Sequence, residues 1–163
     1  NTIIYPNEIF FFFFLVGKPT AEKGYLEGLI LNQGKIDKGI GGGLCQISGA
    51  IFHLALLSQL EIVERHQHSV DIYTEENRYT PLGTDATVVF GYKDLRIRNP
   101  YHFPIQFWFS VEENHFIGEL CSKEKIESSA LNFEIKNSEN QKTVSIIDNG
   151  KIISVSHYKN QSL

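Results

Sequence analysis

Alternating or wholly apolar segments recur along most of the chain and predict a fold built chiefly from strands. Turn residues separate one segment from the next. The expected extended segments span residues 1–16, 29–31, 60–68, 84–90, 94–98, 104–111, 116–121, 131–136, 143–148 and 151–157, and a further strand starts at residue 36. The residues Asp148-Asn149-Gly150, where segment 143–148 leads into segment 151–157, are typical of a tight hairpin turn. The five consecutive phenylalanines Phe10–Phe14 indicate a core strand buried on both faces, or alternatively an aromatic wall for a substrate.

One segment has a helical rather than an alternating pattern. Apolar residues recur near a helical period at Ile47, Ile51, Leu54, Ala55 and Leu57, which predicts a helix over about residues 46–58. Many strand candidates against one clear helix favour an α+β domain. We therefore expect mainly antiparallel β structure, with one principal helix that follows the Gly-Gly-Gly-Leu-Cys motif and packs on the sheet.

The length of 163 residues is enough for a chain to bury its own core. A polar stretch at about residues 122–130 interrupts the strand pattern. We expect residues 1–122 to form the main domain. Residues 123–163 should then form a β-rich C-terminal extension, packed on that domain or appended to it.

Charge and hydropathy narrow the classes of partner. The net charge is −4 and Lys and Arg form no sustained run, so no nucleic-acid partner is expected. The apolar run at residues 9–16 is too short for a membrane span. The sequence contains no methionine, even at its start, so any targeting signal is expected to lie in a preceding segment. Export by such a segment would place the protein at the cell envelope, and otherwise we expect it in the cytoplasm.

The stretch with the clearest chemical character is Gly41-Gly42-Gly43-Leu44-Cys45. Cys45 is expected at or near a helix N-terminus, where unpaired N–H groups and the helix dipole favour the thiolate, the nucleophilic form of cysteine. The N–H groups of the glycines could also bind a developing oxyanion. The alternative is that Cys45 is a small buried apolar residue and the glycines form a tight turn.

Two histidines and an aspartate downstream extend this candidate site. His66 and His68 lie two residues apart, so in a strand they point to the same side, while Arg65 points to the other and is not assigned to the site. The pair indicates either a base with a helper or, together with Cys45, a metal site. Asp85, at the start of an apolar segment, is placed to orient a histidine or to cap backbone N–H groups in a turn.

These motifs resemble those of the VanW family, named after an accessory gene of vancomycin-resistance clusters. The resemblance covers about residues 9–120, and its motifs are Gly41-Gly42-Gly43-Leu44-Cys45-Gln46-Ile47-Ser48, Glu64-Arg65-His66-Gln67-His68-Ser69, Gly83-Thr84-Asp85-Ala86-Thr87 and Asp94-Leu95-Arg96-Ile97-Arg98-Asn99. The chain departs from the family where Phe10–Phe13 replace a frequent Phe-Ser-Phe-Asn, and where Gly49 and Ala50 replace two frequent threonines.

Some VanW-domain proteins look like peptidoglycan L,D-transpeptidases that use the motif cysteine as nucleophile. The resemblance then implies that Cys45 forms a thioester with a stem peptide and that an amine resolves it. His68 is the implied base, with His66 as second choice or as its modulator, and Asp85 orients the imidazole. The remaining candidates supply oxyanion or substrate contacts: Gly42, Gly43, Leu44, Gln46 and Ser48.

The expected partners are peptidoglycan stem peptides or their precursors, and no cofactor or metal is expected. The competing hypothesis is an accessory module without catalysis. In that case the chain would bind wall precursors or a glycopeptide antibiotic, and the Gly-Cys-His cluster would be structural.

Overall fold

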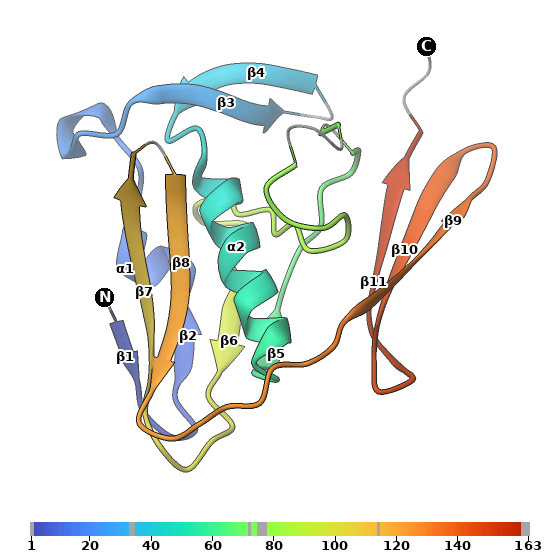
Figure 1. Ribbon diagram of the computed structural model, residues 1–163. Helices are drawn as coiled ribbons and strands as arrows, with labels where there is room; N and C mark the ends of the chain where they lie inside the picture. Colours follow the sequence, from blue (N-terminus) through green and yellow to red (C-terminus); the bar gives the residue numbers. More distant parts are fainter. Residues whose placement is uncertain (1, 33–34, 72, 75–77, 114, 161–163) are drawn as a thin grey trace.

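The computed structural model describes residues 2–32, 35–71, 73–74, 78–113 and 115–160 (Figure 1). The strands are β1 (Thr2–Ile4), β2 (Ile9–Phe11), β3 (Glu27–Asn32), β4 (Lys35–Ile40), β5 (Glu61–Glu64), β6 (Arg96–Arg98), β7 (Ile105–Glu112), β8 (His115–Ser122), β9 (Asn132–Asn137), β10 (Gln141–Asp148) and β11 (Lys151–Lys159). The helices are α1 (Phe12–Val16), the 3₁₀ turn η1 (Ala21–Lys23) and α2 (Leu44–Leu57). The strands form four antiparallel sheets, ordered β1-β7-β8, β2-β6-β5, β3-β4 and β11-β10-β9.

The expected α+β class, with its helix following the glycine–cysteine motif, is wrong. The described residues are mostly antiparallel strands in small separate sheets, and helix is a minor component. Helix α2 begins at Leu44, so Leu44 and Cys45 belong to its first turn. Its N-cap, Gly43, has a left-handed conformation with φ 92°. A glycine adopts this conformation at little cost, so the helix begins directly after Gly43. The periodic apolar residues used for the prediction start only at Ile47.

Several strand predictions are confirmed and others are wrong. The hairpins β7–β8 and β10–β11 form, and Asn149 and Gly150 both have positive φ, as a tight hairpin turn requires. The turn residues 33–34 of the predicted hairpin β3–β4 lie outside the described residues. The expected strand 1–16 ends in helix α1, where Phe12 is buried and Phe14 is 86% exposed. Residues 84–90 form no strand.

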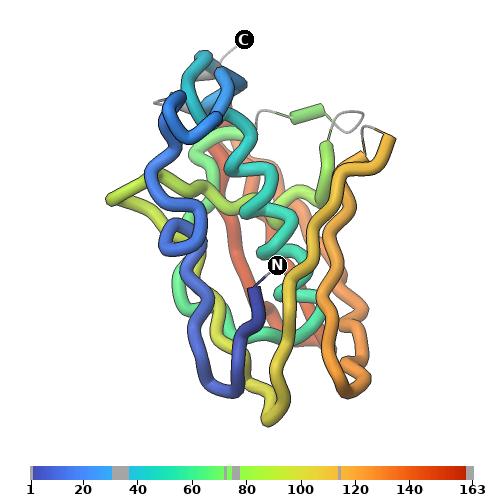
Figure 2. The backbone as a smooth tube through the Cα atoms, turned by 90° about the vertical axis from the view of Figure 1, so that its left-hand side faces the viewer, coloured from blue at the N-terminus to red at the C-terminus, as the bar shows by residue number. Residues whose placement is uncertain are grey.

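The main core surrounds helix α2, which lies beside the β7–β8 hairpin (Figure 1). Ile51, Phe52 and Ala55 on one side of the helix are almost fully buried. The Phe10 ring from β2 packs edge-on against Phe107 of β7, with ring centroids 5.5 Å apart. Figure 2 shows β1, at the N-terminus, running beside β7. No helix within the described part of the chain is long and apolar enough to cross a membrane.

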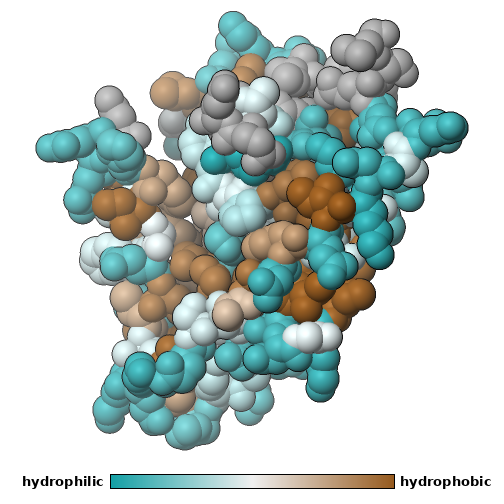
Figure 3. Space-filling model, turned by 45° about the vertical axis from the view of Figure 1, so that its right-hand side comes forward, coloured by the Kyte–Doolittle hydropathy of each residue, from teal (hydrophilic) through white to brown (hydrophobic). Residues whose placement is uncertain are grey.

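The C-terminal sheet β9–β10–β11 lies on the opposite side of α2 from β7–β8 (Figure 1). Its inner face buries Val144 and Tyr158 in a small cluster with Leu82, while Ile146 belongs to the main core. Its outer face mixes polar residues with exposed apolar ones such as Val155, and Figure 3 shows this mixture on the side that it brings forward. The division into domains 1–122 and 123–163 stays a prediction.

A buried asparagine connects the N-terminal strand to the loop that follows β6. Asn99 is fully buried, and its side-chain amide donates to the carbonyls of Ile4 (3.0 Å) and Phe103 (2.9 Å). Its Oδ1 accepts from the N–H of Tyr101 at 2.9 Å. One side chain therefore makes hydrogen bonds to three backbone groups, one in β1 and two in the loop after β6.

We expect Asn99→Ala to lower the free energy of unfolding by about 2–4 kcal/mol, since it leaves buried backbone groups without partners. Urea unfolding followed by fluorescence measures this loss. Asn132→Ala is the matched control, because Asn132 is exposed and makes only a 3.4 Å bond to the Ala130 carbonyl. Equal stabilities of the two variants would contradict the prediction.

Candidate active site

Cys45 lies in the first turn of α2 and lines a groove of about 680 Å³. Its Sγ lies 3.8 Å from the carbonyl oxygen of Val88. The groove walls are largely apolar and aromatic, and they come from α1, the β3–β4 hairpin and the loops before β6: Phe13, Leu29, Ile40, Tyr73, Tyr79 and Phe90. The thiol is therefore placed where a bound molecule can reach it.

Close packing of two glycine backbones positions the loop that leads into α2. A Cβ built on Gly42 would lie only 2.1 Å from the carbonyl carbon of Gly28 in β3. The flanking Gly41 and Gly43 have φ of 82° and 92°, which other residues rarely adopt. The glycine run thus brings the β3–β4 hairpin into direct contact with the loop and so helps to form the groove.

His68 lies between Cys45 and the partly buried carboxylate of Asp85. Its Nδ1 lies 3.0 Å from Oδ2 of Asp85, and its backbone N–H donates to the same oxygen at 2.6 Å. The Cys45 side chain lies close enough to the imidazole to act, with Asp85, in raising the pKa of His68. Because Nδ1 faces Asp85, Nε2 is the nitrogen that remains for the sulfur. The order Cys45–His68–Asp85 is that of a nucleophile, a base and the group that orients the base.

The electrostatics of this chain favour a protonated imidazole. Burial by itself lowers the pKa of His68, but the hydrogen bonds and charges of Asp85 and Cys45 outweigh it and raise the pKa to about 9. Burial likewise acts to raise the pKa of Asp85, yet the hydrogen bond from His68 and the charge of Arg65 hold it below its usual value. At neutral pH His68 is therefore a cation next to the Asp85 carboxylate.

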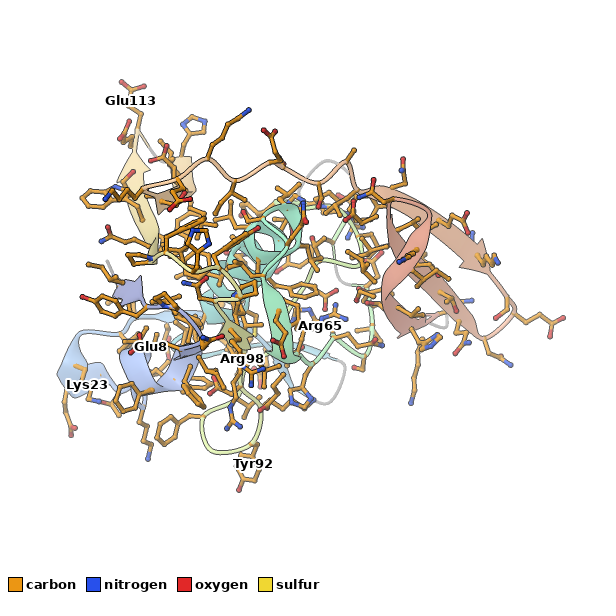
Figure 4. The ribbon with its side chains drawn as sticks, turned by 90° about the horizontal axis from the view of Figure 1, so that it is seen from below. Glu8, Lys23, Arg65, Tyr92, Arg98 and Glu113 are labelled. Atoms are coloured by element: carbon orange, nitrogen blue, oxygen red, sulfur yellow. The ribbon has the colours of Figure 1, made fainter. Side chains whose placement is uncertain are left out.

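Asp85 is held by donors from separate segments. Arg65 donates from Nη2 to Oδ1 at 3.3 Å and from Nε to the Asp85 backbone carbonyl at 2.8 Å. The hydroxyl of Tyr158 in β11 also donates to Oδ1. The Arg65 guanidinium packs over the Phe52 ring of α2, on the side that faces β11 (Figure 4). The carboxylate therefore has partners on both oxygens.

The other sequence candidates fall into two groups. Gly43, Leu44 and Gln46 line the groove together with Cys45. Ser48 is instead fully buried and donates to the Ala86 carbonyl at 2.6 Å, so it connects α2 to the Asp85 loop.

His66 lies apart from the cysteine. Strand β5 ends at Glu64, so the alternation that placed both histidines on one side does not continue to residue 68. Nε2 of His66 pairs with Oε1 of Glu64 at 2.9 Å. Within the described residues, no group of three or more His, Cys, Asp or Glu side chains is arranged to hold a metal ion.

Sequence reasoning missed two groups that hold Asp85. The prediction placed Arg65 on the face opposite the histidines, because it assumed a regular strand through residue 68. In the structure that strand ends at Glu64. The only sequence signal was its place between Glu64 and His66 in a motif. Tyr158 had no such signal, because it is 73 residues away from Asp85 in sequence.

The model of the family described as VanW like protein matches residues 1–121. The chain belongs to the VanW family. This VanW family member is 34% identical over 118 residues to the vancomycin B-type resistance protein VanW of Enterococcus faecalis (strain ATCC 700802 / V583), an alignment that covers 72% of the chain and 43% of the relative. It is 40% identical over 105 residues to the uncharacterized protein YoaR of Bacillus subtilis (strain 168), covering 64% of the chain and 33% of that protein.

The alignments thus span less than half of each of these curated relatives. No solved structure matches the chain. The family match contains Cys45, His68 and Asp85 and ends before β9, so the family model does not include the C-terminal sheet.

We expect Gly42→Ala to displace the hairpin β3–β4 or the loop before α2, because its methyl group overlaps the Gly28 backbone. The variant should lose stability by about 1–3 kcal/mol and alter the reactivity of Cys45. Thermal unfolding and thiol alkylation measure the two effects. Gly49→Ala is the control, since its Cβ would find ordinary contacts at 3.5 Å. A Gly42→Ala protein as stable as this control would contradict the expectation.

The raised pKa of His68 makes its contribution to stability depend on pH. The folded-state pKa, about 9, lies above the ordinary 6.5, so folding favours the proton. The contribution is therefore complete below about pH 6.5 and is lost as the pH rises through about 9. It amounts to at most about 3 to 4 kcal/mol, since one pKa unit corresponds to about 1.4 kcal/mol.

The free energy of unfolding in urea, measured for the wild type and for His68→Ala from about pH 6 to about pH 10, tests this linkage. The stability difference should shrink as the pH rises. His102→Ala, which removes a side chain that is 81% exposed, should show a small and constant difference. A His68 difference that grows with pH would refute the prediction.

Proposed function

We propose that this protein is a cysteine acyltransferase of the L,D-transpeptidase type that acts on peptidoglycan stem peptides. The observation that carries the proposal is the chain Cys45–His68–Asp85 at the wall of the groove. The name of the relative VanW, a vancomycin resistance protein, supports a role connected with the cell wall. Cross-linking of peptidoglycan takes place outside the membrane, so the proposal requires that the protein reach the cell envelope.

In the first proposed step, the Cys45 thiolate attacks a peptide carbonyl of the donor stem and forms a C–S bond. The carbonyl oxygen becomes an oxyanion. As the C–N bond breaks, the His68 imidazolium gives its proton to the departing amine, and a thioester remains on Cys45.

In the second step, the amine of another stem peptide attacks the thioester carbonyl. Neutral His68 accepts the proton of this amine, the new amide bond forms, and Cys45 leaves as thiolate. The imidazolium–thiolate pair is then restored, so the cycle consumes no further reactant. Asp85 keeps its charge throughout and stabilises the imidazolium.

Backbone N–H groups at the start of α2 are suited to bind the oxyanion. The N–H groups of Gly42 and Gln46 donate to Gly39 and Gly43 at 3.3 and 2.9 Å. Within the described part of the chain, the N–H groups of Gly43 and Cys45 have no such partner. We assign these two to the oxyanion site, at the positive end of the helix dipole.

A second candidate function is binding without catalysis. The groove walls are largely apolar and aromatic, which suits a partly apolar ligand. On this alternative, a stem precursor or a glycopeptide would bind equally well to Cys45→Ala and His68→Ala proteins. Binding titrations with these two variants therefore separate the two functions.

We expect Cys45 to react with iodoacetamide at pH 6.5 at least about tenfold faster than an ordinary exposed thiol, since a nearby imidazolium stabilises the thiolate. Cys121, which is exposed and free, provides the reference within the same protein. Mass spectrometry of timed digests gives both rates. His68→Ala should bring the rate at Cys45 down to that at Cys121.

Incubation with a stem tetrapeptide should then add an acyl group to Cys45 in the wild type. The adduct should disappear on addition of an acceptor amine. A Cys45 that is modified only after denaturation would overturn the proposal and would leave the binding function.

A further inference from the structure

The C-terminal strand β11 contacts the candidate active site from outside the family match. Two of its side chains, Ser156 and Tyr158, are buried and lie on the same face of the strand. Tyr158 contacts Asp85, the partner of His68, and Ser156 contacts Arg65, which also binds Asp85. The Tyr158 hydroxyl donates to Oδ1 of Asp85, and Ser156 Oγ accepts from Nη1 of Arg65 at 2.8 Å. A segment that the family model does not cover therefore completes the surroundings of Asp85.

The same strand also contacts the residues on both sides of His68. The side-chain amide of Gln67 donates to the carbonyl of His157. The N–H of Lys159 donates to the carbonyl of Ser69 at 2.9 Å, next to a parallel bridge between Val70 and Lys159. Both ends of the short segment that carries His68 are thus attached to β11.

The remaining contacts of Asp85 show why the tyrosine matters. Oδ2 has two donors, both from His68, at 2.6 and 3.0 Å. Oδ1 has Tyr158 and, at 3.3 Å, Arg65. Without the tyrosine hydroxyl, Oδ1 keeps only the longer of its two bonds, and the carboxylate can rotate away from the imidazole. A hydroxyl of this kind acts on the base through the group that orients it.

We infer that β11 is part of the active site and that Tyr158 is a positioning residue, which holds the Asp85 carboxylate and thereby His68 in line with Cys45. The inference rests on the proposed function. Burial and the Asp85 charge raise the pKa of Tyr158, so its hydroxyl keeps its proton and remains a donor over the working pH range. Ser156 assists by holding Arg65 against the Asp85 loop.

Tyr158→Phe tests the inference, because it removes the hydroxyl and keeps the ring that packs with Leu82 and Val144. The alkylation rate of Cys45 is measured across pH in a Cys121→Ser background. We expect the rate at pH 6.5 to fall by about 3- to 30-fold, and the midpoint of the profile to move to higher pH. The fall is smaller than the roughly 10- to 100-fold effect of a direct hydrogen bond to a charged group, because Tyr158 acts on Cys45 only through Asp85 and His68. Asp85→Asn should have a larger effect in the same direction.

Tyr101→Phe is the matched control. It likewise removes a tyrosine hydroxyl that donates a hydrogen bond, here to the backbone carbonyl of Ser58 at 2.8 Å, at the C-terminal end of α2 and away from Cys45. It should change stability without changing the pH profile of Cys45. The NMR signal of the His68 Nδ1 proton, which lies far downfield when bound to a carboxylate, should shift in Tyr158→Phe and stay in place in Tyr101→Phe.

The outcomes separate the inference from the proposed function. A reactive wild-type Cys45 whose pH profile and His68 signal are unchanged in Tyr158→Phe would overturn the role of Tyr158 and leave the acyltransferase proposal intact. An unreactive Cys45 in the wild type would overturn the acyltransferase proposal and, with it, this inference. A profile that shifts equally in Tyr101→Phe would mean a general loss of stability and would also overturn the role of Tyr158.

Discussion

A carboxylate that is largely removed from water needs hydrogen-bond donors around it, and the region around Asp85, whose side chain is 16% exposed, supplies them. An unpaired charge in this position would cost several kcal/mol. The donors come from the His68 segment, from Arg65 and from Tyr158 in the last strand. Each of these segments is brought to Asp85 by a different part of the fold. The requirement to satisfy one carboxylate therefore links the loop after β5, the loop before β6 and the C-terminal sheet.

The opposite side of the site depends on close backbone packing instead of charge. The glycine loop brings β3 against the start of α2, where the Gly28 and Gly42 backbones meet. This contact sets the position of Cys45 relative to the hairpin that forms one wall of the groove. The thiol thus lies between a rigid glycine contact and a charged hydrogen-bond network.

Local patterns in the sequence were sufficient for much of this architecture. The hairpins near the C-terminus followed from alternation and from the turn residues Asn149 and Gly150. The choice of Cys45, His68 and Asp85 came from the resemblance to VanW family motifs, and their catalytic roles stay a prediction. Helix α1 and the irregular loop 84–90 were missed, since a run of apolar residues does not distinguish a strand from a helix. Contacts over long sequence separations, such as that of Tyr158, leave no trace in local pattern.

The separation of Asp85 and Tyr158 by 73 residues has a consequence for how the protein acquires its chemistry. Strand β11, which completes the network around the aspartate, leaves the ribosome after all three motif residues. A nascent chain that already contains the cysteine, the histidine and the aspartate still lacks the tyrosine. The contacts around Asp85 are therefore complete only after β11 has been synthesised, and a chain cut short before β11 would contain the three motif residues without the Tyr158 contact.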